Sequence, residues 1–235
     1  LLAIAKEHDK AMFSFGYYYQ YVEKNYIKMK EYYLMAIYRG NSDAMYNFGC
    51  YYYKKNDYIG MKMYYLMAID EGNVTAMFNL GHYYEIFEQN YIKAKKYYLM
   101  AIEKDNSDAM YRLGVYYQYI EINYVEMKKY YLMAIEKGCV WSMFDLGHYY
   151  ENVEKNYIEA NKYYLMAIKK GDSPYAMNAL GYYYENVEKN YIKAKKYYLM
   201  AVEKGARWIV HKLIIIEKKM IIEKLVNNDC NSKIS

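Results

Sequence analysis

Histidine and cysteine are the side chains here with the most reactive chemistry, and their spacing does not assemble a catalytic or metal site. Cys50, Cys139 and Cys230 are odd in number and scattered, which fits neither a disulfide framework nor a zinc site and favours a reducing compartment. His82 and His148 lie two copies of a repeat apart, roughly 20 Å at ~8–10 Å per helix layer, too far for one shared ion. The spacing of the residues does not bring together a Ser/His/Asp set, a phosphate-binding glycine loop or a pair of carboxylates. We therefore predict no enzymatic activity, no catalytic residue, no cofactor and no metal ion.

One glycine marks the repeat that must position all of these side chains. Its copies follow each other at intervals of 32 to 34 residues. They are Gly16, Gly49, Gly81, Gly114, Gly147 and Gly181. An alanine after Leu-Met gives the same register, at Ala36, Ala68, Ala101, Ala134, Ala167 and Ala201. A period of this length is typical of a solenoid, and we number the copies repeat 1 to repeat 6 by their glycines.

Hydrophobic periodicity predicts two helices in each repeat. In repeat 3, Met77, Leu80 and Tyr84 share one face of the first helix. The second helix is expected to follow an N-cap and to end at a left-handed glycine. The expected N-caps are Asn25, Asp57, Asn90, Asn123, Asn156 and Asn190. The expected glycines are Gly40, Gly72, Gly138, Gly171 and Gly205, with Asp105 in that place in repeat 3.

Glycine and tyrosine recur at fixed places and are expected to serve packing. A glycine inside a helix costs about 1 kcal/mol relative to alanine, so we expect a close helix approach at the glycine of each first helix. Five tyrosines also recur in every repeat, and we interpret them as scaffold. In repeat 3 they are Tyr83, Tyr84, Tyr91, Tyr97 and Tyr98.

The pattern predicts an all-α fold: a right-handed α-solenoid of stacked antiparallel helix pairs with about 33 residues per repeat. Residues 1–4 align with residues 34–37, so we expect this sequence to begin within a repeat. Whether a segment such as a signal peptide precedes it is left undecided by the sequence. We expect the repeat array over residues 1–205, as a half repeat and six repeats. Capping helices are expected over residues 206–226, as a pair at 209–216 and 220–226, and a polar tail over residues 227–235.

Composition narrows the class of protein. Hydrophobic residues make up 55% of the chain, which is ample for a core. The net charge of +5 is too small to indicate nucleic-acid binding. No apolar run reaches the ~18 residues of a membrane-spanning helix. We predict an intracellular, cytoplasmic protein without a membrane or nucleic-acid partner.

Residues 76–84 and 91–102 resemble a Sel1-like repeat, a member of the tetratricopeptide-type helical solenoids. Leu80, Gly81 and Tyr84 match the family's Leu-Gly-x-x-Tyr. The second helix matches the family's alanine, aromatic and alanine through Ala94, Tyr98 and Ala101. The usual Gly-x-Gly-Val loop is missing, and Tyr97 replaces a tryptophan. Tyrosine-rich copies of this kind look similar to those of giant DNA viruses. The resemblance implies a non-catalytic scaffold that holds proteins together.

The positions that vary between repeats are the candidates for binding. By analogy with tetratricopeptide solenoids, the first helix lines the concave face and exposes three rows of residues. The first row, three residues before the glycine, is Phe13, Tyr46, Phe78, Tyr111, Phe144 and Asn178. The second row, one residue after it, is Tyr17, Cys50, His82, Val115, His148 and Tyr182. The third row, four residues after it, is Gln20, Tyr53, Glu85, Gln118, Glu151 and Glu185.

Aromatic rings with few lysines are typical of interaction surfaces. Near the glycines, six acidic residues outnumber three basic ones, so we predict a mildly acidic, aromatic concave face and a basic outer side. The residues expected to bind a partner are Tyr46, Phe78, His82, Glu85, Tyr111, Gln118, Phe144, His148, Glu151, Tyr182 and Glu185.

The main hypothesis is an adaptor that grips an extended or helical peptide of another protein, whose identity stays open. The first alternative is an RNA-binding helical-repeat protein, which the acidic face argues against. The second is a hydrolase on a solenoid scaffold, which has no support beyond the separate histidines and cysteines.

Overall fold

The computed structural model describes the backbone of residues 2–232 and the side chains of residues 8–225; this backbone is helical and contains no strand. The first helices of the repeats are α1 (Leu2–Tyr21), α3 (Ser42–Lys54), α5 (Val74–Ile86), α7 (Ser107–Tyr119), α9 (Val140–Asn152) and α11 (Pro174–Asn186). The second helices are α2 (Tyr26–Tyr38), α4 (Tyr58–Asp70), α6 (Tyr91–Ile102), α8 (Tyr124–Glu136), α10 (Tyr157–Gly171) and α12 (Tyr191–Glu203). A 3₁₀ turn, η1 (Arg207–Ile209), and helix α13 (Val210–Ser232) follow.

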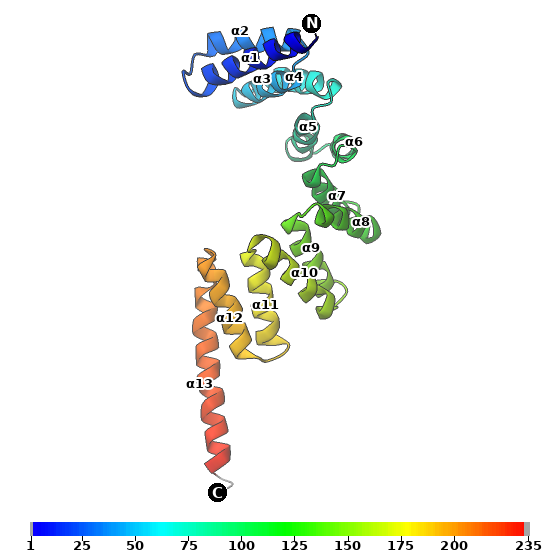
Figure 1. The fold of residues 1–235 in the computed structure, drawn as a ribbon. Coiled ribbons are helices and arrows are strands. Elements are labelled where there is room, and N and C mark those ends of the chain that lie inside the picture. Colours follow the sequence, from blue (N-terminus) through cyan, green and yellow to red (C-terminus); the bar gives the residue numbers. More distant parts are fainter. Residues whose placement is uncertain (1, 233–235) are drawn as a thin grey trace. The chain divides into compact units, whose positions relative to one another are not determined.

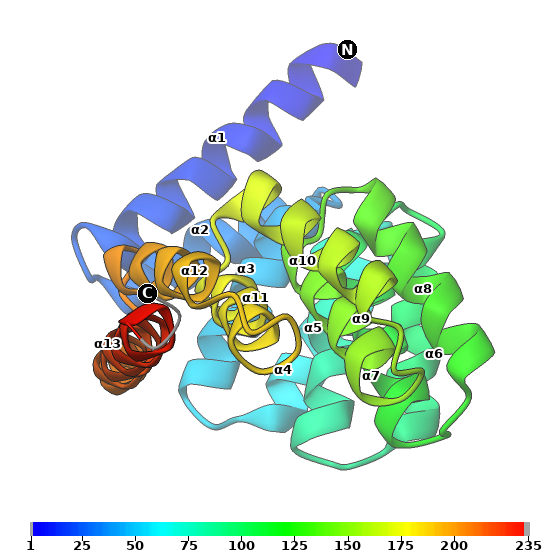
Figure 2. The same ribbon diagram turned by 90° about the horizontal axis from the view of Figure 1, so that it is seen from below.

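The helices form antiparallel pairs, one pair for each repeat (Figure 1). Short turns join the two helices of a pair, which lie side by side (Figure 2). The predicted all-α fold of stacked helix pairs is confirmed. The chain divides into two compact parts, residues Leu1–Leu113 and Gly114–Ser235, which we call the N-terminal part and the C-terminal part. The sites described below each lie within one of these parts.

Side-chain caps start the second helices as the sequence predicts. In each of the six, the N-cap oxygen accepts a hydrogen bond from the backbone amide three residues on. For example, Asn90 Oδ1 lies 3.0 Å from the amide of Lys93. This bond satisfies an amide that has no partner within its helix. At the start of α11, Pro174 follows the N-cap Ser173, a position that tolerates proline.

A residue with left-handed backbone ends most second helices. Four glycines have φ between 79° and 94°, namely Gly40, Gly72, Gly138 and Gly205. Asp105 adopts a φ of 63° in the same place, so repeat 3 keeps the turn without glycine. The prediction for Gly171 is wrong, because α10 includes Gly171 and Asp172 has the positive φ of 49°. The spacing from repeat 5 to repeat 6 is one residue longer, which moves the turn by one residue.

The glycine of each first helix lies under a tyrosine ring of the second helix. A Cβ built on the glycine would lie only 2.3–2.9 Å from that ring in the six repeats. The predicted close approach is therefore confirmed, because any side chain would overlap the ring. We call these buried residues the seated tyrosines: Tyr33, Tyr65, Tyr98, Tyr131, Tyr164 and Tyr198.

In addition to the seated tyrosine, each repeat contains a pair of tyrosines whose rings stack on each other. Ring centroids lie 5.3–5.6 Å apart, with 2–14° between the planes. The pairs are Tyr19–Tyr32, Tyr52–Tyr64, Tyr84–Tyr97, Tyr117–Tyr130, Tyr150–Tyr163 and Tyr184–Tyr197. These tyrosines join the first helix to the second and form part of the scaffold, as predicted.

Helix α1 crosses the expected junction between the half repeat and repeat 1 without a break. Glu7 stands where repeat 1 has Gly40, so the glycine that usually ends a second helix is missing. The backbone therefore continues as one helix of 20 residues. The side chains of residues 1–7, which include the aligned Leu-Leu-Ala-Ile segment, lie outside the described residues.

The C-terminal part ends in one long helix where two were expected. Helix α13 runs from Val210 to Ser232, so the prediction of separate helices at 209–216 and 220–226 is wrong. The residues between them, Glu-Lys-Lys, are good helix formers, and nothing there breaks the helix. Its backbone also continues into the expected polar tail, of which residues 233–235 lie outside the described residues. Ile216 and Leu213 pack against α12.

Candidate functional site

The first row of aromatic residues lies on the seated tyrosines. Phe78 and Tyr98 have ring centroids 5.8 Å apart, and Phe144 lies 5.8 Å from Tyr164 in the same way. Tyr46 lies 5.6 Å from the seated tyrosine of repeat 2. These rings and Tyr111 are half-buried. The row thus contacts the scaffold with one side and leaves the other partly open to solvent.

The third row receives the hydroxyl groups of the seated tyrosines. In five repeats a Gln or Glu oxygen accepts this hydrogen bond. The pairs are Tyr33–Gln20, Tyr98–Glu85, Tyr131–Gln118, Tyr164–Glu151 and Tyr198–Glu185. A buried hydroxyl needs such a partner. The expectation that this row is exposed is therefore wrong for Gln20 and Glu185, which are only 7% and 8% exposed, while Glu85, Gln118 and Glu151 are half-buried.

The environment of the seated tyrosines keeps their hydroxyls protonated. Burial raises the pKa of Tyr98 and Tyr164 well above its usual range, and the carboxylate that each hydroxyl meets raises it further. Each hydroxyl therefore remains a hydrogen-bond donor to one oxygen of the matching glutamate.

Repeat 2 has a tyrosine in the third row and a cleft beside it. Tyr53 turns outward and is 37% exposed. The hydroxyl of Tyr65 lies 3.3 Å from Cys50 Sγ instead. A cleft of about 240 Å³ opens here between α3, α4 and α5, and His82 and Phe87 also line it. This substitution gives the N-terminal part a hollow large enough for a side chain.

The second row is the most varied of the three. Tyr17 and Tyr182 are both 49% exposed, and His148 is exposed. His82 is half-buried and its Nε2 accepts a hydrogen bond of 3.2 Å from the Arg112 guanidinium. Burial lowers the pKa of His82, and Arg112 lowers it further. The neutral imidazole that results can accept this bond.

Repeats 3 and 5 carry the same residues in all three rows. Repeat 3 has Phe78, His82 and Glu85, and repeat 5 has Phe144, His148 and Glu151. In repeat 3, Arg112 of the next first helix contacts both His82 and Glu85, with its Nη1 3.9 Å from Glu85 Oε1. In repeat 5 the corresponding residue of α11 is Ala179. Within residues 8–225, the hydroxyl of Tyr164 is the only polar partner of the Glu151 carboxylate.

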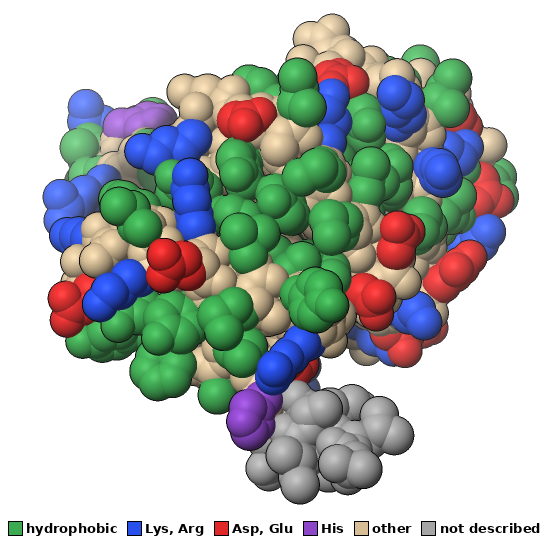
Figure 3. All heavy atoms as spheres, turned by 90° about the horizontal axis from the view of Figure 1, so that it is seen from above, with side chains coloured by type: hydrophobic (Ala, Val, Ile, Leu, Met, Phe, Trp, Pro, Cys, Tyr) green, Lys and Arg blue, Asp and Glu red, His purple; other side chains and the backbone are tan. Residues whose placement is uncertain are grey.

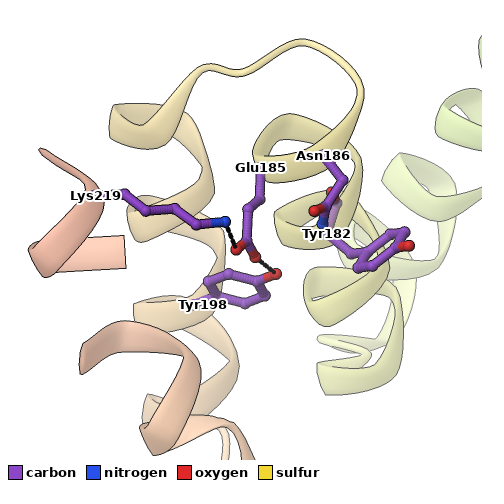
Figure 4. A network of polar contacts seen from close by, with 5 residues as sticks. All are labelled: Tyr182, Glu185, Asn186, Tyr198 and Lys219. Atoms are coloured by element: carbon purple, nitrogen blue, oxygen red, sulfur yellow. Dashed lines mark hydrogen bonds and ion pairs between the residues drawn. The ribbon is translucent and has the colours of Figure 1, made fainter. Parts of the chain in front are cut away.

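In repeat 6, two lysines of α13 contact residues of the first and third rows, as Figure 4 shows for Lys219. Glu185 accepts hydrogen bonds from Tyr198 at 2.8 Å and from Lys219 at 2.7 Å. Burial alone raises the pKa of Glu185, but these two donors outweigh it and leave that pKa below its usual range. Lys212 donates to Asn178 at 3.0 Å and lies 5.2 Å from the ring centre of Tyr198.

Sequence reasoning missed a fourth row, two residues before the glycine, through which α5, α7 and α13 contact the preceding repeat. Asn79 donates to the Tyr46 hydroxyl at 2.8 Å, and Arg112 and Lys212 make the contacts described above. The row is Ser14, Asn47, Asn79, Arg112, Asp145, Ala179 and Lys212. This row includes small, amide, basic and acidic side chains, and such variation is the signal that marks the second row as well.

The surface mixes apolar and charged groups. Figure 3 shows a face on which hydrophobic side chains, tyrosine included, lie among lysines, arginines and acidic residues. Among the described residues there is no cluster of three or more His, Cys, Asp or Glu side chains able to hold a metal ion. None of the described helices is both long and apolar enough to cross a membrane.

Comparison with known proteins identifies the repeat. The family model of the Sel1 repeat matches residues 9–41, 74–106, 107–139, 142–172 and 174–205. Residues 42–73 are not matched; they belong to repeat 2, which is one residue shorter and has Tyr53 in the third row. No curated protein sequence matches this chain.

Solved structures share the fold. A protective antigen of uropathogenic Escherichia coli with an SLR fold has a TM-score of 0.77 at 24% identity, over 93% of this chain and 51% of its own. This chain thus spans about half the length of that protein. A Sel1 repeat protein from Oxalobacter formigenes has a TM-score of 0.65 at 25% identity, over 81% of this chain and 84% of its own. An immunity protein from Pseudomonas aeruginosa has 0.53 at 20% identity, over 85% and 82%. With five matched repeats that cover most of its helix pairs, the chain belongs to the Sel1 repeat family.

Proposed function

We propose that this chain is a non-enzymatic adaptor that binds a partner protein on the concave face formed by its first helices. Sel1 repeat proteins generally mediate protein–protein interactions, and their fold is typically a scaffold without catalysis. The second row carries the proposal. It occupies one fixed place on a constant scaffold, it reaches solvent, and it changes chemistry along the array, from tyrosine to cysteine, histidine and valine. The seated tyrosines, by contrast, are the same in every repeat and serve packing.

Two places on this face are suited to receive side chains of a peptide. Tyr182 presents a half-exposed ring, and rings of this kind often dominate binding energy. The cleft beside Tyr53 has apolar walls from Phe87 and Tyr83 together with the polar groups of His82 and Asn79, and clefts of mixed lining fix a ligand side chain in position.

The RNA-binding alternative finds no support on this face. Glu85 and Glu151 accept hydrogen bonds from the seated tyrosines Tyr98 and Tyr164, and carboxylates repel the phosphates on which nucleic-acid affinity depends.

Selection of peptides from a random phage-displayed library on the immobilised chain tests the proposal. The selected peptides are synthesised with a fluorescent label, and their Kd values are measured by anisotropy. For each peptide, Tyr182→Ala or Tyr53→Ala is expected to raise the Kd about tenfold, since a truncated central ring commonly costs over 1 kcal/mol.

Matched controls are Ile158→Ala and Ile59→Ala, which change residues 82% and 83% exposed on the second helices. These controls should leave the Kd within about twofold, as expected for residues outside an interface. Loss of binding in the controls with retention in Tyr182→Ala and Tyr53→Ala, or failure to enrich any peptide, overturns the proposal.

A further inference from the structure

We propose that repeat 5 binds the guanidinium group of an arginine of the partner protein, between His148 and Glu151. This inference rests on the proposed function, because it names a chemical group that the same face recognises. Its geometry comes from repeat 3, where an arginine of this chain fills the equivalent place.

In repeat 3 the two oxygens of the glutamate have separate roles. Glu85 Oε2 accepts the hydroxyl of Tyr98, and Glu85 Oε1 lies 3.9 Å from Arg112 Nη1. The other terminal nitrogen of Arg112 lies 3.2 Å from His82 Nε2. A guanidinium group is a planar fork with several donors, so it reaches the carboxylate and the imidazole at once.

Repeat 6 divides the two oxygens in the same way. Glu185 Oε2 accepts the hydroxyl of Tyr198, and Glu185 Oε1 accepts a hydrogen bond from Lys219 of α13 (Figure 4). Two of the three glutamates in the third row therefore hold a cation on Oε1, which is supplied by α7 in repeat 3 and by α13 in repeat 6.

Repeat 5 has the same acceptors without the cation. Glu151 Oε2 accepts the hydroxyl of Tyr164 at 2.5 Å, and no cationic side chain within residues 8–225 contacts Oε1. Ala179 ends at its Cβ where Arg112 extends toward the preceding repeat. Asn186, which corresponds in α11 to Lys219, donates to the backbone oxygen of Tyr182 instead. The site combines the half-buried Glu151 carboxylate with the exposed His148 ring, and it lacks the cation that its two counterparts contain.

The acceptor set selects arginine over a metal ion or a phosphate. Glu151 and His148 are only two potential ligands, and no group of three exists among the side chains described. A phosphate is repelled by the carboxylate. An arginine pairs its charge with Glu151 and donates to the exposed imidazole of His148, as Arg112 does to His82.

The test uses the peptides selected above and two variants of the full chain. We expect the selected peptides to contain an arginine whose replacement by citrulline, which is neutral and of similar shape, raises the Kd about tenfold or more. Glu151→Gln should raise the Kd of the arginine peptide by a similar factor and should have no further effect on the citrulline peptide.

Ala179→Arg is the sharper variant, because it removes no group of the site. It places an arginine where Arg112 stands in repeat 3, so it should fill the site from within and raise the Kd of the arginine peptide about tenfold, as Glu151→Gln does. Thermal unfolding of both variants verifies that they fold. Arg112→Ala, which changes only the filled counterpart, is the control and should not weaken binding.

Three results overturn the arginine site. They are selected peptides without arginine, a lysine replacement that binds as tightly as arginine, or unchanged Kd values in Glu151→Gln and Ala179→Arg. If Tyr182→Ala still weakens binding in the last case, the adaptor function stands and only the arginine site is wrong. If no substitution on the first helices weakens binding, the adaptor proposal itself fails.

Discussion

Glycine and the seated tyrosine make the contact on which each helix pair depends. In repeat 4 a Cβ on Gly114 would lie 2.3 Å from Cδ1 of Tyr131. Alanine normally stabilises a helix relative to glycine by about 1 kcal/mol. Here the added methyl group must displace a fully buried ring, and overpacking of this kind costs about 1–3 kcal/mol. The balance of these two effects decides whether alanine at position 114 stabilises or destabilises the chain.

We predict that Gly114→Ala lowers the stability of the chain by about 1–2 kcal/mol, because the overlap outweighs the gain in helix propensity. Thermal unfolding followed by circular dichroism measures the effect. Lys196→Ala, a substitution at an exposed site of α12, is the control and should leave the midpoint nearly unchanged. A midpoint raised by Gly114→Ala would show that the helices have room to separate.

The third row shows what sequence reasoning reaches at the residue scale and what it does not. The rows follow from the period, and the close approach follows from the cost of glycine in a helix. The role of Glu85 and Gln118 as hydroxyl acceptors does not follow, because their partners lie 13 residues away on another helix. Glutamate suits a solvated face and a buried hydroxyl equally well, so only the packing distinguishes these roles.

The turn that joins the two helices of each repeat contains a residue with left-handed backbone. Between each first and second helix one residue has a positive φ, and in repeat 4 this residue is Ile122, with φ of 52°. A branched β-carbon is poorly tolerated in left-handed backbone. Asn56 holds the corresponding position in repeat 2 with φ of 58°, and asparagine tolerates this conformation well.

Ile122→Asn is expected to raise the stability of the chain by about 1 kcal/mol, since it removes this strain and Ile122 is 64% exposed. Chemical denaturation measures the change. Ile120→Asn alters a neighbouring exposed isoleucine outside the left-handed backbone and should give no gain. Equal effects of the two substitutions would show that the gain comes from replacing an exposed apolar side chain and not from relief of backbone strain.

Helix α13 contacts α11 partly through the charged Glu185 carboxylate, which acid protonates. The pKa of Glu185 lies below the ordinary value of 4.5 because its donors outweigh burial. A carboxyl group with a lowered pKa stabilises the folded state at pH above its ordinary pKa. This contribution falls as the pH drops below about 4.5 and is gone below the pKa of the folded state.

We predict that acid weakens the docking of α13 in this pH window. Trp208 lies in the turn η1 just before α13, so its fluorescence in a Trp141→Phe background reports on this end of the chain. Glu185→Gln should reduce the dependence on pH below about 4.5, whereas Glu203→Gln, exposed on α12, should retain it. An unchanged pH profile in Glu185→Gln would assign the transition to another group.

Helix boundaries were predictable where a single residue decides them. N-caps and left-handed glycines act on the backbone next to them, so Asn90 and Gly72 mark helix ends in sequence and structure alike. The C-terminal segment lacks such a marker. Isoleucines at 214–216 and 221–222 look like two short apolar elements, but the Glu-Lys-Lys segment between them contains only good helix formers and continues one helix.

Contacts in the whole molecule mainly join helices that follow each other in the chain. The stability of such an array is close to a sum over repeats and their neighbours. We predict that Leu180→Ala, which removes a buried side chain of repeat 6, speeds amide exchange in α10 to α13 more than in α3 to α6. Hydrogen exchange with mass spectrometry resolves this. A uniform increase along the chain would indicate a single cooperative unit.

Isoleucine at position 214 stands on α13 where the six first helices have glycine. Even a single carbon atom at those glycines would overlap the tyrosine ring above it, and the Ile214 side chain is larger and 52% exposed. A tyrosine ring therefore cannot lie on position 214 of α13 as the ring of Tyr198 lies on Gly181. Head-to-tail contacts that do not close into a ring propagate into filaments, and we expect Ile214 to disfavour such contacts between α13 and a second copy of the chain.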